Sequence, residues 1–315
     1  MSRPQIAPEV VVVGSYNLDV VFSVERLPAP GETCLGMGRI TSPGGKGSNQ
    51  ALQAARCGAA TAMIACIGED AAGQSALEVW RQAGIDVSGV RRTAEAGTAM
   101  AAIFVDANGE NCIVVDSAAN ALLGVADIEA ARGLIAGAKL VVAQLETSVA
   151  ATRAAFTLAR ASGARTVLNA APAPEAIDAA LLALTDVLVV NELEGLALTG
   201  LSQPSAIGAA LIERVGEAVA LTLGAQGAVL FARGRAPLSL AAHAVRTVDT
   251  TGAGDALTGA FCARLAAGDG LDEALRYGVA AAALACTVKG AAASFAPDAA
   301  IRERMGASRP TSAPP

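Results

Sequence analysis

The chain has 315 residues, of which 53% are hydrophobic and 3% aromatic, and its formal net charge is −6. This length and composition are typical of one large α/β domain or two modest ones, with a core of Ala, Val and Leu. The negative charge argues against a nucleic-acid-binding surface, and no apolar run reaches the roughly 18 residues of a membrane-spanning helix.

Strands and helices are expected to alternate along most of the chain. Residues 9–15 are a β-branched run that ends in Gly-Ser, which is typical of a buried strand. Further strands are predicted at residues 60–68, 138–146, 164–170, 186–191 and 218–224, and helices at 47–58, at 71–84 and after Gly252. The predicted strands are continuously apolar, as a parallel sheet buried on both faces requires. Because they alternate with predicted helices, the sequence predicts an α/β fold.

Two segments interrupt this alternation. Residues 17–42 contain short apolar stretches and Pro-rich turns, and residues 97–116 are two apolar runs joined by Asn108-Gly109, a strong hairpin signal. We expect both to form a small β lid on a three-layer α/β sandwich, whose central, mostly parallel sheet carries helices on both faces. The predicted domains are an N-terminal tail at 1–8, a single domain at 9–305 and a disordered tail at 306–315.

The cysteines and the first residues indicate a cytoplasmic protein. None of the six cysteines forms a C-x-x-C pair, which favours buried free thiols in a reducing compartment. His243 is the only histidine, so a histidine metal site or a Ser-His-Asp triad is not expected. Residues 1–10 contain no apolar core of a secretory signal.

The stretch DTTGAGDALTGAF at residues 249–261 is an unusual start for a helix. Its glycines let backbone N–H groups converge at a helix N-terminus, where the helix dipole favours an anion such as a phosphate. Asp255 lies in the same turn. A helix cap would explain Asp255 alone but not the Gly-Ala-Gly before it, so the stretch favours catalytic chemistry over capping.

A second glycine loop runs into a helix at residues 42–51, where Lys46 and Asn49 add donors that suit hydroxyl groups. It is not a P-loop, and no G-x-G-x-x-G follows the first strand, which argues against a dinucleotide-binding oxidoreductase. NELE at 191–194 and TLGAQG at 222–227 also follow predicted strands. Because ligands of open α/β sheets bind at the carboxyl ends of the strands, these four elements predict one site.

These motifs resemble the ribokinase branch of the PfkB carbohydrate kinase family. GGKGSNQA matches the family's first signature, DTTGAGDALTGAF matches its second, and NxxE and TLGxxG lie in order between them. The resemblance covers about residues 9–305 and implies Mg²⁺-dependent transfer of the ATP γ-phosphate to a sugar hydroxyl. It implies Asp255 as the general base, and the amides of Gly252, Ala253 and Gly254 as the anion hole for the phosphoryl group.

The resemblance also implies how both substrates are held. Asn191 would lie by the ATP phosphates and Glu194 by the Mg²⁺ ion, through water. The nucleotide would be bordered by Thr222, Gly224, Ala225, Gly227 and Gly254. The sugar would be held by Asn17, Asp19, Gly45, Lys46, Asn49, Glu146 and Asp255. Carboxylates accept hydrogen bonds from vicinal diols, and the full set favours ribose, phosphorylated at its 5-hydroxyl.

A K⁺ site and a homodimer are further implications of the resemblance. The K⁺ ligands, mostly backbone carbonyls, would come from Asp249, Thr251, Ala285, Val288, Gly290 and Ser294. The exposed face of the lid would pair two chains.

Val279 departs from the pattern, since several members place a polar residue there, near the adenine. Two alternatives stay open: a related kinase for deoxyribose, another sugar or a nucleoside, and a non-catalytic sugar or nucleotide sensor, which the intact Asp255 argues against.

Overall fold

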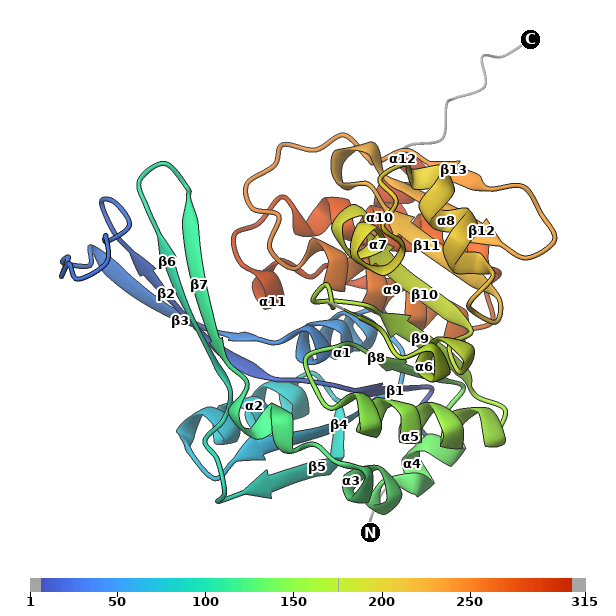
Figure 1. The fold of residues 1–315 in the computed structure, drawn as a ribbon, viewed down its shortest axis with the longest axis horizontal. Coiled ribbons are helices and arrows are strands. Elements are labelled where there is room, and N and C mark those ends of the chain that lie inside the picture. The colour runs from blue at the N-terminus through green and yellow to red at the C-terminus, as the bar shows by residue number, and fades with distance from the viewer. Residues whose placement is uncertain (1–6, 175, 308–315) are drawn as a thin grey trace.

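The computed structural model describes residues 7–174 and 176–307, which form a large α/β core with a small sheet projecting from one side (Figure 1). Of the two predicted tails, residues 1–6 and 308–315 lie outside the described residues. Gly306 and Ala307, which were assigned to the C-terminal tail, instead end helix α12 (Asp298–Ala307). The helix extends this far because Ile301 and Met305, one turn apart, both pack against the core.

The central sheet of the described chain has nine strands in the order β13-β12-β11-β10-β9-β8-β1-β4-β5. The strands from β11 to β5 in this order run parallel, whereas β12 and β13 are antiparallel at one edge. Their bounds are β1 Val10–Val13, β4 Thr61–Gly68, β5 Asp86–Thr93, β8 Leu140–Ala143, β9 Arg165–Asn169, β10 Val187–Asn191, β11 Ala218–Thr222, β12 Ala228–Ala232 and β13 Leu238–Leu240. The predicted mostly parallel sheet is therefore confirmed.

Helices cover both faces of this sheet, which confirms the predicted three layers. Alternate residues of β1 enter different clusters: Val10 and Val12 belong to one, and Val11 and Val13 to the other. The first face carries α1 (Lys46–Arg56), α2 (Ala71–Gln82), α9 (Ala253–Ala266), α10 (Leu271–Ala285), α11 (Ala291–Ser294) and α12. The opposite face carries α3 (Val125–Ala130), α4 (Arg132–Gly137), α5 (Val149–Ala161), α6 (Ala179–Ala183), α7 (Glu192–Thr199) and α8 (Pro204–Ile212).

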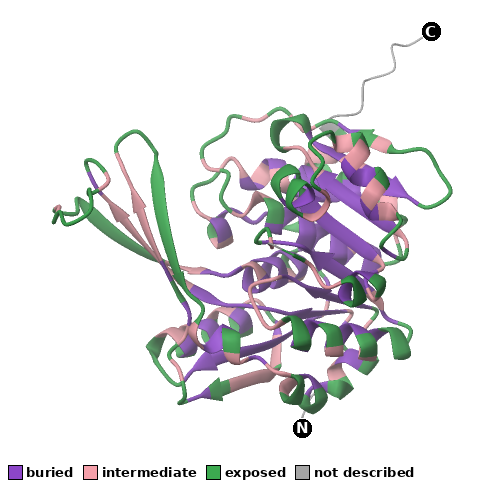
Figure 2. Ribbon diagram, viewed as in Figure 1, coloured by how far each residue is buried: buried purple, intermediate pink, exposed green. Residues whose placement is uncertain are grey.

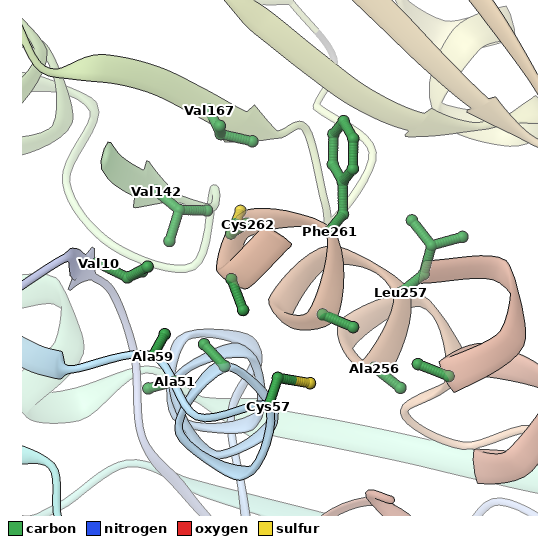
Figure 3. Close-up of a cluster of buried hydrophobic side chains, with 14 of the residues drawn as sticks. Val10, Ala51, Cys57, Ala59, Val142, Val167, Ala256, Leu257, Phe261 and Cys262 are labelled. Atoms are coloured by element: carbon green, nitrogen blue, oxygen red, sulfur yellow. The ribbon is translucent and has the colours of Figure 1, made fainter. Parts of the chain in front are cut away.

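Helices α1 and α9 pack closely against each other, although about 200 residues separate them in the chain (Figure 3). Small residues such as Ala51 and Ala256 line the contact. At Gly259 the approach is so close that a Cβ would lie 2.5 Å from the backbone oxygen of Gln50. The first turns of both helices are thereby held side by side, which brings together the two glycine motifs of the sequence.

The small sheet has the strand order β3-β2-β6-β7, with β2 Asn17–Ser23, β3 Gly38–Gly44, β6 Met100–Val105 and β7 Asn111–Asp116. The predicted hairpin and the strands expected within 17–42 thus pair into one sheet, where β2 and β6 run parallel. Figure 2 shows that this sheet is half-buried or exposed over most of its length, whereas the central strands are buried. Phe22 and Phe104 stack across β2 and β6 at 5.5 Å.

The burial of the cysteines corrects one expectation. Cys57, Cys66 and Cys262 are buried, but Cys112 is exposed on the projecting sheet, and Cys34 and Cys286 are half-buried. Within the described residues no single helix is long and apolar enough to cross a membrane; the bent pair α7–α8 passes that test by length and composition alone.

Candidate active site

Helix α9 begins with a backbone conformation that favours glycine. Gly252, the residue before the helix, has φ +79°, and a Cβ there would lie 2.7 Å from that of Ala291. Asp255 is the third residue of the helix and only 7% exposed. Because the first N–H groups of a helix have no intrahelical acceptor, Asp255 lies beside a turn that can bind an anion.

Both carboxylate oxygens of Asp255 accept hydrogen bonds from α1. Asn49 Nδ2 donates to Oδ2 and Gln50 Nε2 donates to Oδ1, each at 2.9 Å. Burial raises the pKa of Asp255, whereas the charge of Lys46 and the two amide hydrogen bonds act to lower it. A carboxylate with a raised pKa is a stronger proton acceptor than a solvated one, as general-base catalysis requires.

A second carboxylate, Glu146, lies at the start of α1. Its Oε2 accepts the Ser15 hydroxyl at 2.5 Å and the backbone N–H of Lys46 at 2.9 Å. Burial acts to lower the pKa of the Lys46 ammonium, but the charges of Asp255, Glu146 and Glu194 outweigh it and raise that pKa. Since these bonds use one carboxylate oxygen of Glu146, the other is able to accept from a ligand.

Asp19, on β2, is the third carboxylate of this cluster. Burial, followed by the charges of Glu146 and Asp255, raises the pKa of Asp19 to about 7. Gly44 faces it across the small sheet, and a Cβ at that position would overlap the Asp19 carboxylate. Gly45, with φ +86°, lets the chain turn from β3 directly into α1. The three carboxylates and Lys46 therefore form one compact charged cluster.

Asn17 is held by a residue that the sequence analysis did not identify. Asn120 Nδ2 donates to Asn17 Oδ1 at 2.9 Å and to the backbone oxygen of Tyr16 at 3.1 Å. The N–H of Tyr16 donates back to Asn120 Oδ1 at 3.1 Å. With its oxygen engaged, Asn17 presents its amide N–H groups as donors. Asn120 lies in the short 3₁₀ helix η1 (Ala118–Leu122), and no motif surrounds it.

The NELE motif forms a capping box at the carboxyl end of β10. Asn191 Oδ1 accepts the N–H of Glu194, and Glu194 Oε2 accepts the N–H of Asn191, both at 2.8 Å. Burial raises the pKa of Glu194. Thr222 pairs with Asn191 in the sheet, and the turn after it contains Gly224 at φ +53° and Gly227 at φ +99°. The capping box fixes Glu194 while leaving one carboxylate oxygen for a ligand.

The start of the 249–261 stretch is tied to the segment between α10 and α11. Asp249 Oδ1 accepts the N–H of Thr251 at 2.9 Å and its hydroxyl at 2.7 Å, and Oδ2 accepts the N–H of Gly290 at 2.8 Å. Burial acts to raise the pKa of Asp249, but these bonds outweigh it and lower that pKa. Of the other predicted K⁺ ligands, Ala285 ends α10, Val288 follows it and Ser294 ends α11.

A cavity of 210 Å³ opens where these elements meet. Among the predicted residues it is lined by Lys46, Asn191, Glu194, Thr222, Gly252, Gly254 and Asp255. A second groove of 760 Å³ lies between the segment after β13 and helices α9, α10 and α12, and Val279 forms part of its wall. The structure thus brings seven of the predicted residues around one cavity, but Ala253, Gly224, Ala225 and Gly227 are not among its lining residues. Asn17 and Asp19, on β2, and Glu146, after β8, do not line it either.

The family comparison agrees with this geometry. The family model described as pfkB family carbohydrate kinase matches residues 7–299. The chain belongs to this family. It is 38% identical to a ribokinase of Haemophilus influenzae over 90% of this chain and 94% of that protein. It is 40% identical to a ribokinase of Mus musculus over 82% of each.

A solved structure gives the same result for the fold. The Arabidopsis thaliana ribokinase complexed with ribose and ATP superposes with a TM-score of 0.88 at 31% identity. The match covers 95% of this chain and 99% of that one, so it includes both the central sheet and the projecting sheet. The ribokinase-like three-layer fold is therefore confirmed.

Proposed function

We propose that this family member transfers the γ-phosphoryl group of ATP to the 5-hydroxyl of D-ribose, giving ribose 5-phosphate and ADP. The observation that carries the proposal is the buried Asp255 carboxylate, which lines the 210 Å³ cavity and adjoins Asp19 and Glu146. The ribose and ATP held by the similar plant ribokinase support the choice of substrates. A cytoplasmic location, where ATP is available, belongs to the same proposal.

The reaction forms a bond between the sugar oxygen and the γ-phosphorus and breaks the bond from that phosphorus to the β,γ-bridging oxygen, which leaves on ADP. Asp255 accepts the proton of the attacking hydroxyl as its oxygen becomes nucleophilic. The backbone amides of Gly252 and Gly254, at the α9 N-terminus, stabilise the charge on the transferring group. The N–H of Ala253, the third predicted donor, instead donates to the backbone oxygen of Thr250 at 3.2 Å in this structure. Lys46 adds a positive charge beside Asp255.

The residues present fit the two metal ions that the family implies. Glu194 lines the cavity with one carboxylate oxygen outside its capping box, and Mg²⁺ in kinases is held by one or two carboxylates together with phosphates and water. Bound there, Mg²⁺ would neutralise charge on the phosphates of ATP. For K⁺, we propose Asp249 with backbone oxygens of Thr251, Ala285, Val288, Gly290 and Ser294, a set rich in the oxygen donors that such a cation takes.

The sugar is held from the lid side of Asp255. Asn17 presents donors, whereas Asp19 and Glu146 present acceptors, and this arrangement suits adjacent hydroxyl groups. Asn49 Oδ1 is buried without a hydrogen-bond partner in the described part of the chain, so a sugar hydroxyl would satisfy it. A site of this kind discriminates against a sugar that lacks one hydroxyl, which favours ribose over deoxyribose.

The exposed face of the lid supports a homodimer. β7 carries Ile113, Val114 and Val115, and each of them is more than half exposed. Met37 and Ile40 add further exposed apolar side chains around β3. Alternate side chains of a strand point to opposite faces, so Ile113, Val115 and Ile40 share the face of Asp19, whereas Val114 lies with Val20 and Ala102 on the opposite face. Exposed apolar side chains on that opposite face are typical of an interface, and a second copy of the same sheet would pair there across a twofold axis.

ADP release tests the function directly. With MgATP and K⁺ present, ribose should be turned over faster than 2-deoxyribose, fructose, 2-keto-3-deoxygluconate or adenosine. A preference for one of the other acceptors would keep the kinase and overturn the sugar assignment. Binding of ribose and ATP without any ADP release would instead identify a sensor.

A further inference from the structure

Gln50 is a fully buried side chain beside Asp255 that the scheme above does not use. It is 0% exposed on α1. Its Nε2 donates to Asp255 Oδ1 and to Asn169 Oδ1, both at 2.9 Å, and its Oε1 accepts from Gln144 Nε2 at 2.6 Å. A glutamine amide has two N–H groups, and here both are used within the protein. Gln50 therefore has no donor for a ligand.

The direction of this hydrogen-bond chain is set by a backbone carbonyl. Asn169 Nδ2 donates to the backbone oxygen of Val189 at 3.2 Å. Because a carbonyl oxygen only accepts, Asn169 turns its Nδ2 toward Val189 and its Oδ1 toward Gln50. Gln50 must then present its Nε2 to Asn169, which leaves its Oε1 to accept from Gln144. The network consequently aims an N–H donor, and never an oxygen, at Asp255.

We infer that Gln50 is the positioning residue for the catalytic base: with Gln144 and Asn169 behind it, it anchors Asp255 Oδ1 and so fixes the plane of the carboxylate that receives the proton. The inference rests on the proposed function. Asn49 differs from Gln50, because its own Oδ1 has no hydrogen-bond partner within the described chain. Under the proposed function, that oxygen accepts a hydrogen bond from a hydroxyl group of the sugar. Of the residues that take part in the proposed reaction, Gln50 bonds to Asp255.

Two effects follow from removing this anchor. The carboxylate gains freedom to rotate, so fewer encounters have the geometry for proton transfer. The ionised form of Asp255 also loses a hydrogen bond that stabilises it, so its pKa rises. The other charged groups that act on this carboxyl are Lys46, Glu146, Asp19 and Glu194, and all of them remain in the variant.

The test compares Gln50→Met with Gln53→Met. Gln53 lies one turn further along α1, is also 0% exposed, and donates to the backbone oxygen of Ala296 at 2.9 Å and to Cys57 Sγ at 3.1 Å. For Gln50→Met we expect kcat to fall roughly 10- to 100-fold, because small misplacements of a catalytic group cost up to about 100-fold. The KM for ATP should change less than about threefold, since Gln50 has no free donor with which to bind ATP.

The pH profile separates positioning from a general loss of packing. The acidic limb of kcat should move to higher pH by about one unit in Gln50→Met, since loss of a hydrogen bond to the charged form raises a carboxyl pKa. It should stay in place in Gln53→Met. Suppose that kcat falls equally in the two variants and that the acidic limb of its pH profile moves in neither. Gln50 would then contribute only to packing, and the inference would be overturned.

Two provisions keep the result decisive. If Gln50→Met does not fold, Gln144→Met leaves Asp255 and Gln50 in place but removes the bond that orients the Gln50 amide. A smaller displacement in the same direction is then expected, and an unchanged profile contradicts the inference. The profiles are measured with the acceptor that the wild-type protein turns over fastest, so a wild type that prefers another sugar overturns the proposed function without affecting this comparison.

Discussion

The raised pKa of Asp19 predicts a sugar affinity that depends on pH near neutrality. Burial and the charges of Glu146 and Asp255 raise this pKa to about 7, so Asp19 is mostly protonated at pH 6 and mostly ionised at pH 8. Only the ionised carboxylate accepts hydrogen bonds with both of its oxygens. The competent fraction of the free enzyme therefore rises with pH across this window.

The size of the effect follows from that pKa. If only ionised Asp19 binds the sugar, the apparent KM equals the intrinsic value divided by the ionised fraction. For a pKa of about 7 this fraction is roughly 0.1 at pH 6 and 0.9 at pH 8, so KM for ribose should fall about tenfold between them. The KM for ATP should change little, because Asp19 lies on the lid side of Asp255.

Initial rates at pH 6, 7 and 8, with ribose varied at saturating ATP, measure this effect. Asp19→Asn keeps the shape of the side chain but cannot ionise, so its ribose KM should be high and independent of pH. The reasoning is refuted by a flat wild-type KM between pH 6 and 8. It is equally refuted by an Asp19→Asn variant that keeps the tenfold change, since another group would then be responsible.

Four shorter predictions test the remaining assignments. Asp255→Asn should lower kcat by about 10²- to 10⁴-fold with an unchanged calorimetric Kd for ATP, and near-normal turnover would remove it from the base role. Asn120→Ala should raise the ribose KM about tenfold, because Asn17 loses its support; an effect confined to the KM for ATP would contradict this. Replacement of K⁺ by Na⁺ should slow turnover, and equal rates would leave Asp249 as a loop-stabilising residue. Val114→Lys on β7 should shift the light-scattering mass from dimer to monomer, whereas a wild-type monomer would exclude the lid interface.

Much of the fold could be predicted because its signals are local. The continuously apolar runs of β1, β4 and β10 reflect burial on both faces, and Asn108-Gly109 marks the hairpin between β6 and β7. β5 was not predicted. Its sequence, DVSGVRRT, is polar because the strand lies at the edge of the sheet and is only half-buried.

The candidate site could be predicted only where a reactive side chain and the glycines that shape the backbone around it lie in one short stretch of sequence. Gly252 and Asp255 lie three residues apart within one motif, and the positive φ of Gly252 explains why that motif contains glycine. The partners of Asp255 lie elsewhere: its hydrogen bond with Asn49 spans 206 residues, and the bond between Gln50 and Asn169 spans 119. Periodicity and spacing carry no information about such contacts, since they arise only when α1 packs on α9.

The lid and the sugar site are connected in a way that only the folded chain reveals. β2 begins at Asn17, and η1 starts two residues after β7 ends, so both lid strands join the core beside Asn120. Its side chain bonds the backbone of Tyr16 and the amide of Asn17, and it is itself buried. Asn120 therefore ties the start of β2, which carries Asn17 and Asp19, to the segment that follows β7. Two of the predicted sugar-binding residues and both lid connections therefore share one buried anchor.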